Sequence, residues 1–293
     1  MIYLVDGPVY VFRGWFALPD TLRSPQGEPA NAFRGFADFL QRLLGRIGGA
    51  PVAIAFDESL TRSFRNEIHP GYKAGRELPP AELERQFDWC RRLCRAQGLM
   101  ELASPRFEAD DLIASLARVA HERGEAVSVV SRDKDLIQVL RPGDRWLRSA
   151  DDSGRDYAAV AEELGCPPER MAAVQALTGD PVDDIPGVPG IGIKTATRLL
   201  AHFGELDQLM DAAAAADTFH CPGLRGAARF ARLIKTHRAT VELARQLTEL
   251  RQDAPLPAGE IRRDPPDRTA LAELDAEAGL GRRLSHLWLA EGA

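Results

Sequence analysis

The chain has 293 residues, of which 45% are hydrophobic and 27% are charged, enough to bury a substantial core in one large domain or two smaller ones. This composition excludes a disordered chain, and no apolar run approaches the roughly 18 residues that span a bilayer. The net charge of −6 argues at first against a nucleic-acid partner. The first residues lack the basic and apolar regions of a secretion signal, so we expect a cytoplasmic protein without a membrane partner.

Three short apolar runs rich in β-branched residues predict buried strands of a parallel sheet, at 2–5, 52–56 and 127–130. Amphipathic helical stretches separate them, so we expect an α/β fold. Asp6 and Asp57 directly follow the first two runs. One aspartate after a strand is usually a turn or helix-capping residue. Because Asp133 and Asp135 also follow the third run, and parallel strands open their carboxyl ends onto one crevice, the pattern predicts a shared site.

The four cysteines do not have the spacing of a zinc site. Cys90 and Cys94 share the apolar face of a predicted helix with Leu83 and Phe87. We therefore expect all four cysteines to be reduced and at least two to lie in the core.

A further acidic group, Glu108, Asp110 and Asp111, begins a predicted amphipathic helix that extends to about residue 119. Negative charges at a helix N-terminus interact favourably with the helix dipole, which explains one or two of them without a metal ion. Three acids within four positions exceed what helix capping requires. Beside the strand-end aspartates, they favour a cation-binding role.

The second half of the chain becomes Ala-rich and helical, and its most specific segment is residues 177–196, with Asp180 and Asp183 before a glycine-rich turn. Glycines let the backbone approach a ligand closely, and free N–H groups at the following helix start favour a phosphate. A glycine-rich turn alone is more often structural. With Lys194 and Thr195 it gives a helix-hairpin-helix signature for sequence-independent binding of a DNA backbone. The expected contacts are Gly190, Ile191, Gly192, Ile193, Lys194 and Thr195.

Five basic residues recur at three- or four-residue steps in a later helix-like stretch: Arg225, Arg229, Arg232, Lys235 and Arg238. This spacing suits a stripe that faces DNA phosphates. A solvated helix face has the same pattern, and for this stretch alone we prefer that interpretation.

Nine carboxylates thus fall at predicted strand ends or helix starts: Asp6, Asp57, Glu108, Asp110, Asp111, Asp133, Asp135, Asp180 and Asp183. Acids from separate segments repel each other unless cations lie between them, and hard divalent ions such as Mg²⁺ or Mn²⁺ prefer oxygen ligands. Two such ions about 3.5–4 Å apart can activate water and stabilise the leaving oxygen in phosphodiester hydrolysis, which makes a nuclease the first hypothesis. With nine of the 43 acids at metals, the 37 Lys and Arg outnumber the rest, which removes the objection to a nucleic-acid partner.

Seven short motifs follow one another along the chain: Val5-Asp6-Gly7, Phe56-Asp57, Gly71-Tyr72-Lys73-Ala74-Gly75-Arg76, Glu108-Ala109-Asp110-Asp111, Asp133-Lys134-Asp135, Thr178-Gly179-Asp180 with Asp183, and Pro186-Gly187-Val188-Pro189-Gly190-Ile191-Gly192. In this order they resemble the 5′-nuclease (flap endonuclease) superfamily. Within it, they resemble the 5′-3′ exonuclease domain of bacterial DNA polymerase I and its stand-alone relatives. The likeness covers most of the chain, which ends near where that nuclease domain would end, without room for a polymerase.

The resemblance implies a PIN-like α/β catalytic domain over residues 1–165, with a central mostly parallel sheet and a helical arch at about 71–98. It implies a helical DNA-binding region of the helix-three turn-helix type over residues 166–293, which includes the hairpin and a C-terminal tail. By the family pattern, Tyr72 can stack on a base, while Lys73 and Arg76 contact the scissile phosphate. Their charges suit this role, because charge that develops on a phosphate needs nearby cations.

The same resemblance assigns the acids to two Mg²⁺ ions, which Mn²⁺ can replace. The first would be held, directly or through water, by Asp6, Asp57, Glu108, Asp110 and Asp111, and the second would be completed by Asp133, Asp135, Asp180 and Asp183. It also implies a K⁺ ion in the hairpin, bound by the backbone oxygens of Leu177, Thr178, Pro186, Val188 and Ile191. Asp184 stands where polymerase-linked relatives usually have Asn, and Pro181-Val182 replaces a more polar pair. We expect altered hydrogen bonding near the second ion, with both ion sites kept.

Three other classes of protein share parts of this pattern. A haloacid-dehalogenase-like phosphatase needs a second aspartate two residues after the first, where this chain has Pro8. A PIN-type ribonuclease would not need the hairpin at residues 190–195. A non-catalytic, structure-specific DNA-binding module would tolerate loss of acids, whereas the full set is present; this module is the alternative that we keep.

We therefore expect a metal-dependent 5′-3′ exonuclease and flap endonuclease of DNA replication and repair. Its expected partner is DNA with a 5′ single-stranded flap or a 5′ end, and a separate DNA polymerase is a further candidate. We expect the protein to be a monomer.

Overall fold

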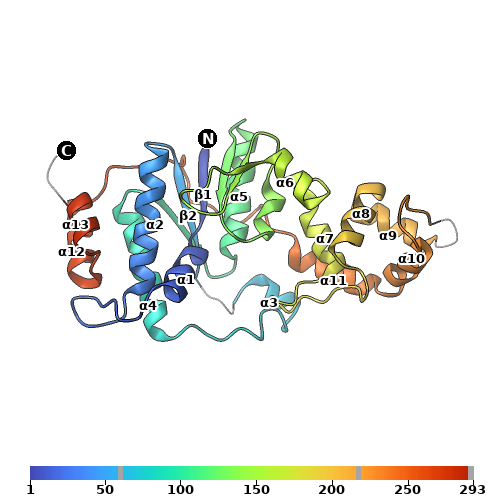
Figure 1. Ribbon diagram of the computed structural model, residues 1–293, viewed down its shortest axis with the longest axis horizontal. Helices are drawn as coiled ribbons and strands as arrows, with labels where there is room; N and C mark the ends of the chain where they lie inside the picture. The colour runs from blue at the N-terminus through green and yellow to red at the C-terminus, as the bar shows by residue number, and fades with distance from the viewer. Residues whose placement is uncertain (59–61, 216–218, 290–293) are drawn as a thin grey trace.

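The computed structural model describes residues 1–58, 62–215 and 219–289, whose arrangement is shown in Figure 1. Within these residues one sheet has six strands in the order β3-β2-β1-β4-β5-β6. The strands are β1 (Ile2–Asp6), β2 (Val52–Asp57), β3 (Met100–Ser104), β4 (Val127–Val130), β5 (Arg145–Leu147) and β6 (Arg155–Asp156). All neighbours pair in parallel except β6, which runs antiparallel to β5. The predicted mostly parallel sheet is confirmed.

Helices cover both faces of this sheet. On one face lie α1 (Gly7–Ala17), α2 (Asn31–Ile47) and α4 (Ala81–Ala96), and on the other lies α5 (Ala109–Glu122). Side chains alternate between the two cores, so Val5 and Ile54 pack with α1 and α2, whereas Leu4 and Ala53 pack with α5. Burial on both faces explains why the predicted strands are almost continuous apolar runs.

The three predicted strands form the centre of the sheet, where β1 lies between β2 and β4. The sequence does not predict β3, β5 or β6, which lie toward the two edges. β5 and β6 have only three and two residues, too few for a periodic pattern.

The second half of the chain is helical, as predicted, and its described helices surround a core of their own. They are α7 (Met171–Thr178), α8 (Ile193–Phe203), α9 (Leu206–Ala214), α10 (Ala227–Thr236) and α11 (Arg238–Thr248). Between β4 and α7 lie two 3₁₀ turns, η1 (Asp135–Val139) and η2 (Pro168–Arg170), and helix α6 (Tyr157–Leu164).

The end of the chain returns to the first half. Leu250, Ala254 and Leu256 pack into the core beside α5. Helices α12 (Arg268–Ala278) and α13 (Arg282–Leu289) then pack against α2 and α4, at the opposite end of the molecule from α8–α10 (Figure 1). The predicted boundary near residue 165 stays a prediction, but the tail that we assigned to the helical region lies on the sheet-containing half.

The segment predicted as a helical arch, residues 71–98, has a different form. The chain is turn and extended backbone after α3 (Phe64–Ile68) until α4 begins at Ala81. Helix α4 is no free-standing arch, because Leu83, Trp89 and Leu93 are buried against α2 and α12. The amphipathic pattern of this stretch therefore reflects a helix that packs in the core in this structure, and an arch at about 71–98 stays a prediction.

The four cysteines are buried and free, as expected. Among the described residues, we find no helix with both the length and the apolar character needed to cross a bilayer.

Candidate functional site

The carboxyl ends of the central strands bring the first acidic residues together. Asp6 and Asp57 are the last residues of the neighbouring strands β1 and β2. The Ser131 hydroxyl donates to Asp6 Oδ2 at 2.6 Å, and the same Ser131 oxygen accepts from the backbone N–H of Asp133 at 2.9 Å. The backbone N–H of Ala109 donates to Asp57 Oδ1 at 2.7 Å, so the end of β2 touches the start of α5.

Eight carboxylates form a group that we call the acidic cluster: Asp6, Asp57, Glu108, Asp110, Asp133, Asp135, Asp180 and Asp183. Their proximity is visible in their electrostatics. Burial, with the charges of Asp133 and Asp57, raises the pKa of Asp6 to about 7. Burial, with Asp133 and the more distant Asp180 and Asp183, raises the pKa of Asp135 to about 8.

Repulsion between acidic side chains also affects Asp110. Burial, with Asp6, Asp133 and Asp135, raises the pKa of Asp110 well above its ordinary value. The structure therefore gathers acids from β1, β2, α5, η1 and the hairpin around one place, as their positions at strand ends and helix starts predict.

Asp180 and Asp183 lie on a tight turn after α7. Asp180 and Ile185 exchange two backbone hydrogen bonds, of 3.0 and 2.8 Å, which close the turn. Asp184 has a φ of 56°, in the left-handed region that Asn and Asp tolerate better than most residues. The replacement of the usual Asn by Asp184 is therefore conformationally conservative.

This turn is joined to the segment that contains Lys73. The Lys73 N–H donates to the Asp183 carbonyl at 3.0 Å, and the Gly75 N–H donates to Asp184 Oδ2 at 3.0 Å. Arg76 forms an ion pair with Asp183, and Lys73 Nζ lies 3.8 Å from Asp183 Oδ2. Burial raises the pKa of Asp183, and these two cations oppose the shift.

Glu108 is the acidic residue with the most positive surroundings. Lys73 Nζ lies 2.9 Å from Oε1, the Tyr72 hydroxyl donates to Oε2 at 2.9 Å, and Arg65 Nη1 lies 3.4 Å from Oε2. Burial alone would raise the pKa of Glu108, but Lys73 and Arg65 outweigh it and hold the pKa below its ordinary value. Glu108 is therefore held ionised.

Tyr72 does not have the geometry that we expected for base stacking. Its side chain is only 4% exposed and packs in the core of the helical half, with its ring beside Lys73. Because protein covers the ring, this conformation does not present Tyr72 for stacking, and stacking on a DNA base stays a prediction. Its hydroxyl instead orients Glu108.

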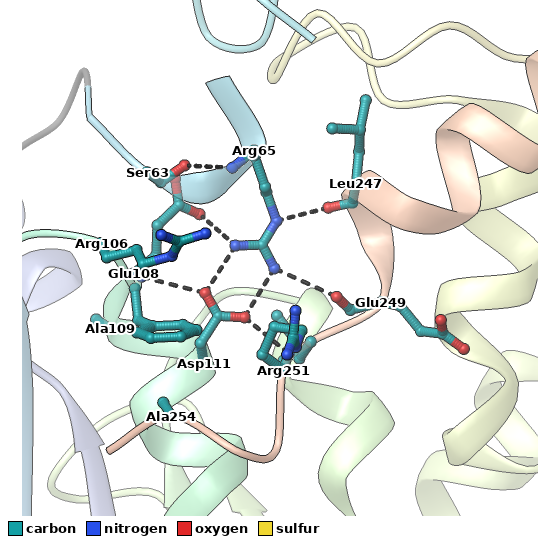
Figure 2. Close-up of polar contacts among 12 residues, drawn as sticks. Ser63, Arg65, Arg106, Glu108, Ala109, Asp111, Leu247, Glu249, Arg251 and Ala254 are labelled. Atoms are coloured by element: carbon teal, nitrogen blue, oxygen red, sulfur yellow. Dashed lines mark hydrogen bonds and ion pairs between the residues drawn. The ribbon is translucent and has the colours of Figure 1, made fainter. Parts of the chain in front are cut away.

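Asp111 is not available to a metal ion, contrary to the prediction. Arg65 donates to both of its oxygens, at 2.7 and 2.8 Å, and the backbone N–H groups of Arg251 and Glu108 donate at 2.8 and 3.1 Å (Figure 2). These four bonds occupy the lone-pair directions of a carboxylate. Asp111 instead completes a capping box at the start of α5, which is the alternative role that a helix-first-turn acid can have.

Several of the remaining carboxylates accept hydrogen bonds from neighbouring donors. Within the described residues, no three His, Cys, Asp or Glu side chains are arranged so that they could hold one metal ion as they stand. Gln175 Nε2 donates to Asp135 Oδ1 at 2.6 Å, and the Val182 N–H donates to Asp180 Oδ1 at 2.8 Å.

The predicted hairpin follows directly on the acidic turn. Its two arms touch at Gly187, where an added Cβ would lie 2.2 Å from the carbonyl carbon of Thr178. The Val188 N–H donates to the Leu177 carbonyl at 2.8 Å, and the Ile191 N–H donates to the Val188 carbonyl at 3.0 Å. The close approach thus brings the backbones of Leu177 and Thr178, two of the residues expected to bind K⁺, against Gly187 and Val188.

Helix α8 begins at the end of this hairpin, with Gly192 as its N-cap residue. No acid lies in its first turn, and Ile193 and Lys194 are exposed. Free N–H groups, the helix dipole and Lys194 therefore face solvent together, which is the arrangement that favours a phosphate.

The basic residues of the predicted stripe fall into two groups in the structure. Arg229 of α10 lies next to the hairpin, since an added Cβ on Gly190 would be 3.5 Å from its Nη2 atom. Arg232 is exposed on the same helix. Lys235 donates to the Ala214 carbonyl, and Arg238 pairs with Glu242 at 2.8 Å on α11. Only the first part of the stripe continues the hairpin surface.

Family models identify both halves of the chain. A model described as the N-terminal resolvase-like domain of 5′-3′ exonuclease matches residues 1–165, and one described as its C-terminal SAM fold matches residues 166–269. The chain belongs to the 5′-3′ exonuclease family. The predicted family resemblance is thereby confirmed.

Curated relatives of this family member include free-standing and polymerase-linked proteins. A 5′-3′ exonuclease of Mycobacterium tuberculosis is 35% identical over 301 residues, which cover 94% of this chain and 90% of that protein. DNA polymerase I of Rhizobium leguminosarum is 42% identical over 219 residues, 72% of this chain and 22% of the polymerase. The chain thus spans 22–34% of the length of DNA polymerase I relatives that it matches.

Solved structures share the fold of this 5′-3′ exonuclease family member at low sequence identity. The T5 D15 protein co-crystallised with metal ions has a TM-score of 0.65 at 18% identity, over 98% of this chain and 96% of that one. The catalytic core of Rad2 in complex with DNA substrate has a TM-score of 0.63 at 14% identity, over 98% and 90%. The predicted fold class is confirmed.

Three residues at the site were missed by reasoning from the sequence: Arg65, Ser131 and Gln175. Ser131 carried a signal, since it lies between a predicted strand and Asp133. Arg65 carried none, because its partners Asp111 and Leu247 lie 46 and 182 positions away along the chain.

Proposed function

We propose that this protein hydrolyses DNA phosphodiester bonds near the junction of a 5′ single strand and a duplex, as a 5′-3′ exonuclease and 5′-flap endonuclease. The observation that carries the proposal is the acidic cluster at the carboxyl ends of the central strands, next to a hairpin whose helix start is free to bind phosphate. A backbone site beside a hydrolytic site suits a substrate recognised by its shape rather than its bases.

The acidic cluster fits two divalent metal ions of the hard kind. Its donors are carboxylate oxygens, several are buried, and their raised pKa values express a deficit of positive charge that ions would relieve. We assign the first ion to Asp6, Asp57, Glu108 and Asp110, and the second to Asp133, Asp135, Asp180 and Asp183. We expect Mg²⁺, with Mn²⁺ as a substitute. When bound, the ions would activate water and stabilise the leaving oxygen.

Lys73 and Arg76 supply the positive charge that the protein itself contributes. Lys73 lies between Glu108 and Asp183, which belong to different ion sites in our assignment, and Arg76 pairs with Asp183. With these carboxylates bound to metal ions, Lys73 and Arg76 would be available to pair with the scissile phosphate, where negative charge develops. Tyr72 orients Glu108.

The hairpin would hold the duplex. We propose that Gly190, Ile191, Gly192, Ile193, Lys194 and Thr195 contact a phosphate, and that a K⁺ ion lies between that phosphate and the carbonyls of Leu177, Thr178, Pro186, Val188 and Ile191. The gathering of the hairpin arms at Gly187 supports this arrangement. We expect a monomeric protein that works in the cytoplasm beside a separate DNA polymerase.

Cleavage of a 5′-flap duplex and of a blunt duplex by purified protein tests the proposal, in Mg²⁺ and in chelator, with Asp133→Asn in parallel. We expect Mg²⁺-dependent cutting near the flap junction that the variant lacks. Tight binding to the flap without cutting in Mg²⁺ would replace our proposal with a non-catalytic, structure-specific DNA-binding protein.

A further inference from the structure

Arg65 is a charged side chain buried at the centre of the molecule. Its guanidinium is 1% exposed, and every one of its five N–H donors has an acceptor (Figure 2). Two bonds go to Asp111, at 2.7 and 2.8 Å, and three go to Glu108 Oε2, the Leu247 carbonyl and the Glu249 carbonyl, at 3.4, 2.7 and 3.4 Å. Full satisfaction by a bidentate pair and carbonyls is what makes burial of a guanidinium tolerable.

These bonds join three segments that are distant in the sequence. Arg65 itself is on α3, just before the loop that carries Lys73 and Arg76. Leu247 and Glu249 belong to the last turn and C-cap of α11, whose carbonyls have no partner within the helix. Arg65 therefore ties the end of the helical half to the start of α5.

The network ends at Glu108, which our proposed function places at the first metal ion. Arg65 acts on it twice, directly through Oε2 and indirectly through Asp111, whose carboxylate accepts the Glu108 N–H at 3.1 Å. Lys73 and Tyr72 hold the two Glu108 oxygens from the other side. The position of the Glu108 carboxylate is thus fixed by groups that include Arg65, which is more deeply buried than Lys73, with side chains 1% and 13% exposed.

We propose that Arg65 is a positioning residue that holds Glu108 in place for a divalent ion and so sets the affinity of the first metal site. This rests on the proposed two-ion function. Arg65 touches neither substrate nor ion, because its side chain is closed off by Asp111, α11 and the Phe64 ring, 4.6 Å from its Cζ. Partners that orient a metal ligand typically change metal affinity about 10–100-fold when removed.

The test is direct Mn²⁺ binding to the protein without DNA, measured by the electron paramagnetic resonance signal of free Mn²⁺, with circular dichroism to establish folding. We expect Arg65→Gln to weaken the tighter Mn²⁺ site about 10–100-fold, and Arg65→Lys to weaken it less, since lysine keeps the charge but not the paired geometry. Arg91→Gln is the control. It removes one guanidinium from Glu101, a carboxylate 7% exposed, compared with 12% for Glu108, on the far edge of the sheet.

A double-mutant cycle separates positioning from folding. If Arg65 acts through Glu108, then Arg65→Lys adds no loss of Mn²⁺ affinity in a Glu108→Gln background. Folded Arg65 variants with the affinity of wild type, or an equal loss in Arg91→Gln, would overturn the inference. If Arg65→Gln does not fold, the Mn²⁺ affinity of Arg65→Lys tests the inference. Absence of Mn²⁺ binding in the wild-type protein would instead reject the proposed function.

Discussion

Single carboxylates in this protein differ in role according to the charge around them. Glu108 has Lys73 and Arg65 beside it and is ionised, whereas burial and neighbouring acids raise the pKa of Asp6 to about 7 and that of Asp135 to about 8. Asp111 resembles its neighbours in sequence but is neutralised by Arg65. Acidic residues within four positions therefore differ in role. Glu108 is a candidate metal ligand, and Asp111 is a structural helix cap.

The raised pKa values predict how pH affects stability. Protons on Asp6 and Asp135 stabilise the folded state below the unfolded pKa of 3.8, and this contribution is lost as pH rises through about 7 and 8. We expect the melting temperature in chelator to fall between pH 6 and pH 8.5. Mg²⁺ should raise it more at pH 8.5 than at pH 6, because fewer protons must be displaced.

Thermal melts across this pH range check the expectation. The double variant Asp6→Asn with Asp135→Asn serves as control and should show a smaller fall, since it lacks both titrating groups. A melting temperature that rises with pH in chelator would contradict the assigned electrostatics.

Asp133 should matter for chemistry and not for binding. It is exposed just after β4 and is not among the residues that we assign to the phosphate contact. We expect Asp133→Asn to lower the cleavage rate about 100-fold or more, on the scale of a lost transition-state contact, with DNA affinity nearly unchanged. Single-turnover cleavage and equilibrium binding of the same flap substrate check this. Equal losses in both would count against its place at the second ion.

The helices and strands bring these residues together, which their positions along the sequence alone do not. The end of β1, between β2 and β4, sets Asp6 at the centre of the acidic cluster. The α7–α8 hairpin then carries both Asp180 and Asp183 and the helix start that we propose to bind phosphate. One turn thus connects the acidic cluster to the proposed DNA contact, so the fold sets the distance between them.

At the helix start, Lys194→Ala should weaken binding to duplex DNA and lower the salt-dependence slope by about 1, as expected for one lost phosphate contact. Arg229→Ala should act in the same direction, because Arg229 lies beside Gly190. Titrations of binding against salt concentration check both.

The comparison variant for these titrations is Arg238→Ala. Arg238 belongs to the same basic stripe in sequence but is paired with Glu242, so its removal should leave the slope close to that of the wild-type protein. Identical slopes for all three variants would remove the hairpin from the DNA-binding surface.

The chain passes from the sheet-containing half to the helical half and then returns, and this return holds the whole molecule together. Residues after α11 pack on α5, and α12 then closes the core formed by α2 and α4. Trp89 of α4 donates to Glu277 of α12 at 2.8 Å. The acidic cluster lies at one end of the sheet. The last helices of the chain, α12 and α13, pack on the helices that cover this sheet.

Truncating a buried residue of α12 should therefore destabilise the catalytic half. Leu274 is 1% exposed, so we expect Leu274→Ala to lower the free energy of unfolding by about 2–5 kcal/mol. Leu287→Ala of α13, where the side chain is 51% exposed, should have little effect. Chemical denaturation of both variants checks this. A small effect of Leu274→Ala would show that α12 is not part of the core.

The amino-acid sequence by itself determined the local features of this protein. Apolar runs located the central strands, acids at their ends located the candidate metal site, and glycines before Lys194 located the hairpin. These follow from sequence because period, strand ends and helix starts depend on neighbouring residues.

Only the tertiary structure decided which side chains are free to act. Both Asp111 oxygens are paired with Arg65, Tyr72 is covered by the helical core, and α4 packs in the core of the sheet-containing half. The last helices lie on the first half of the chain. These outcomes depend on burial and charge pairing between segments that are far apart in sequence, and no local pattern encodes which segment will supply the partner.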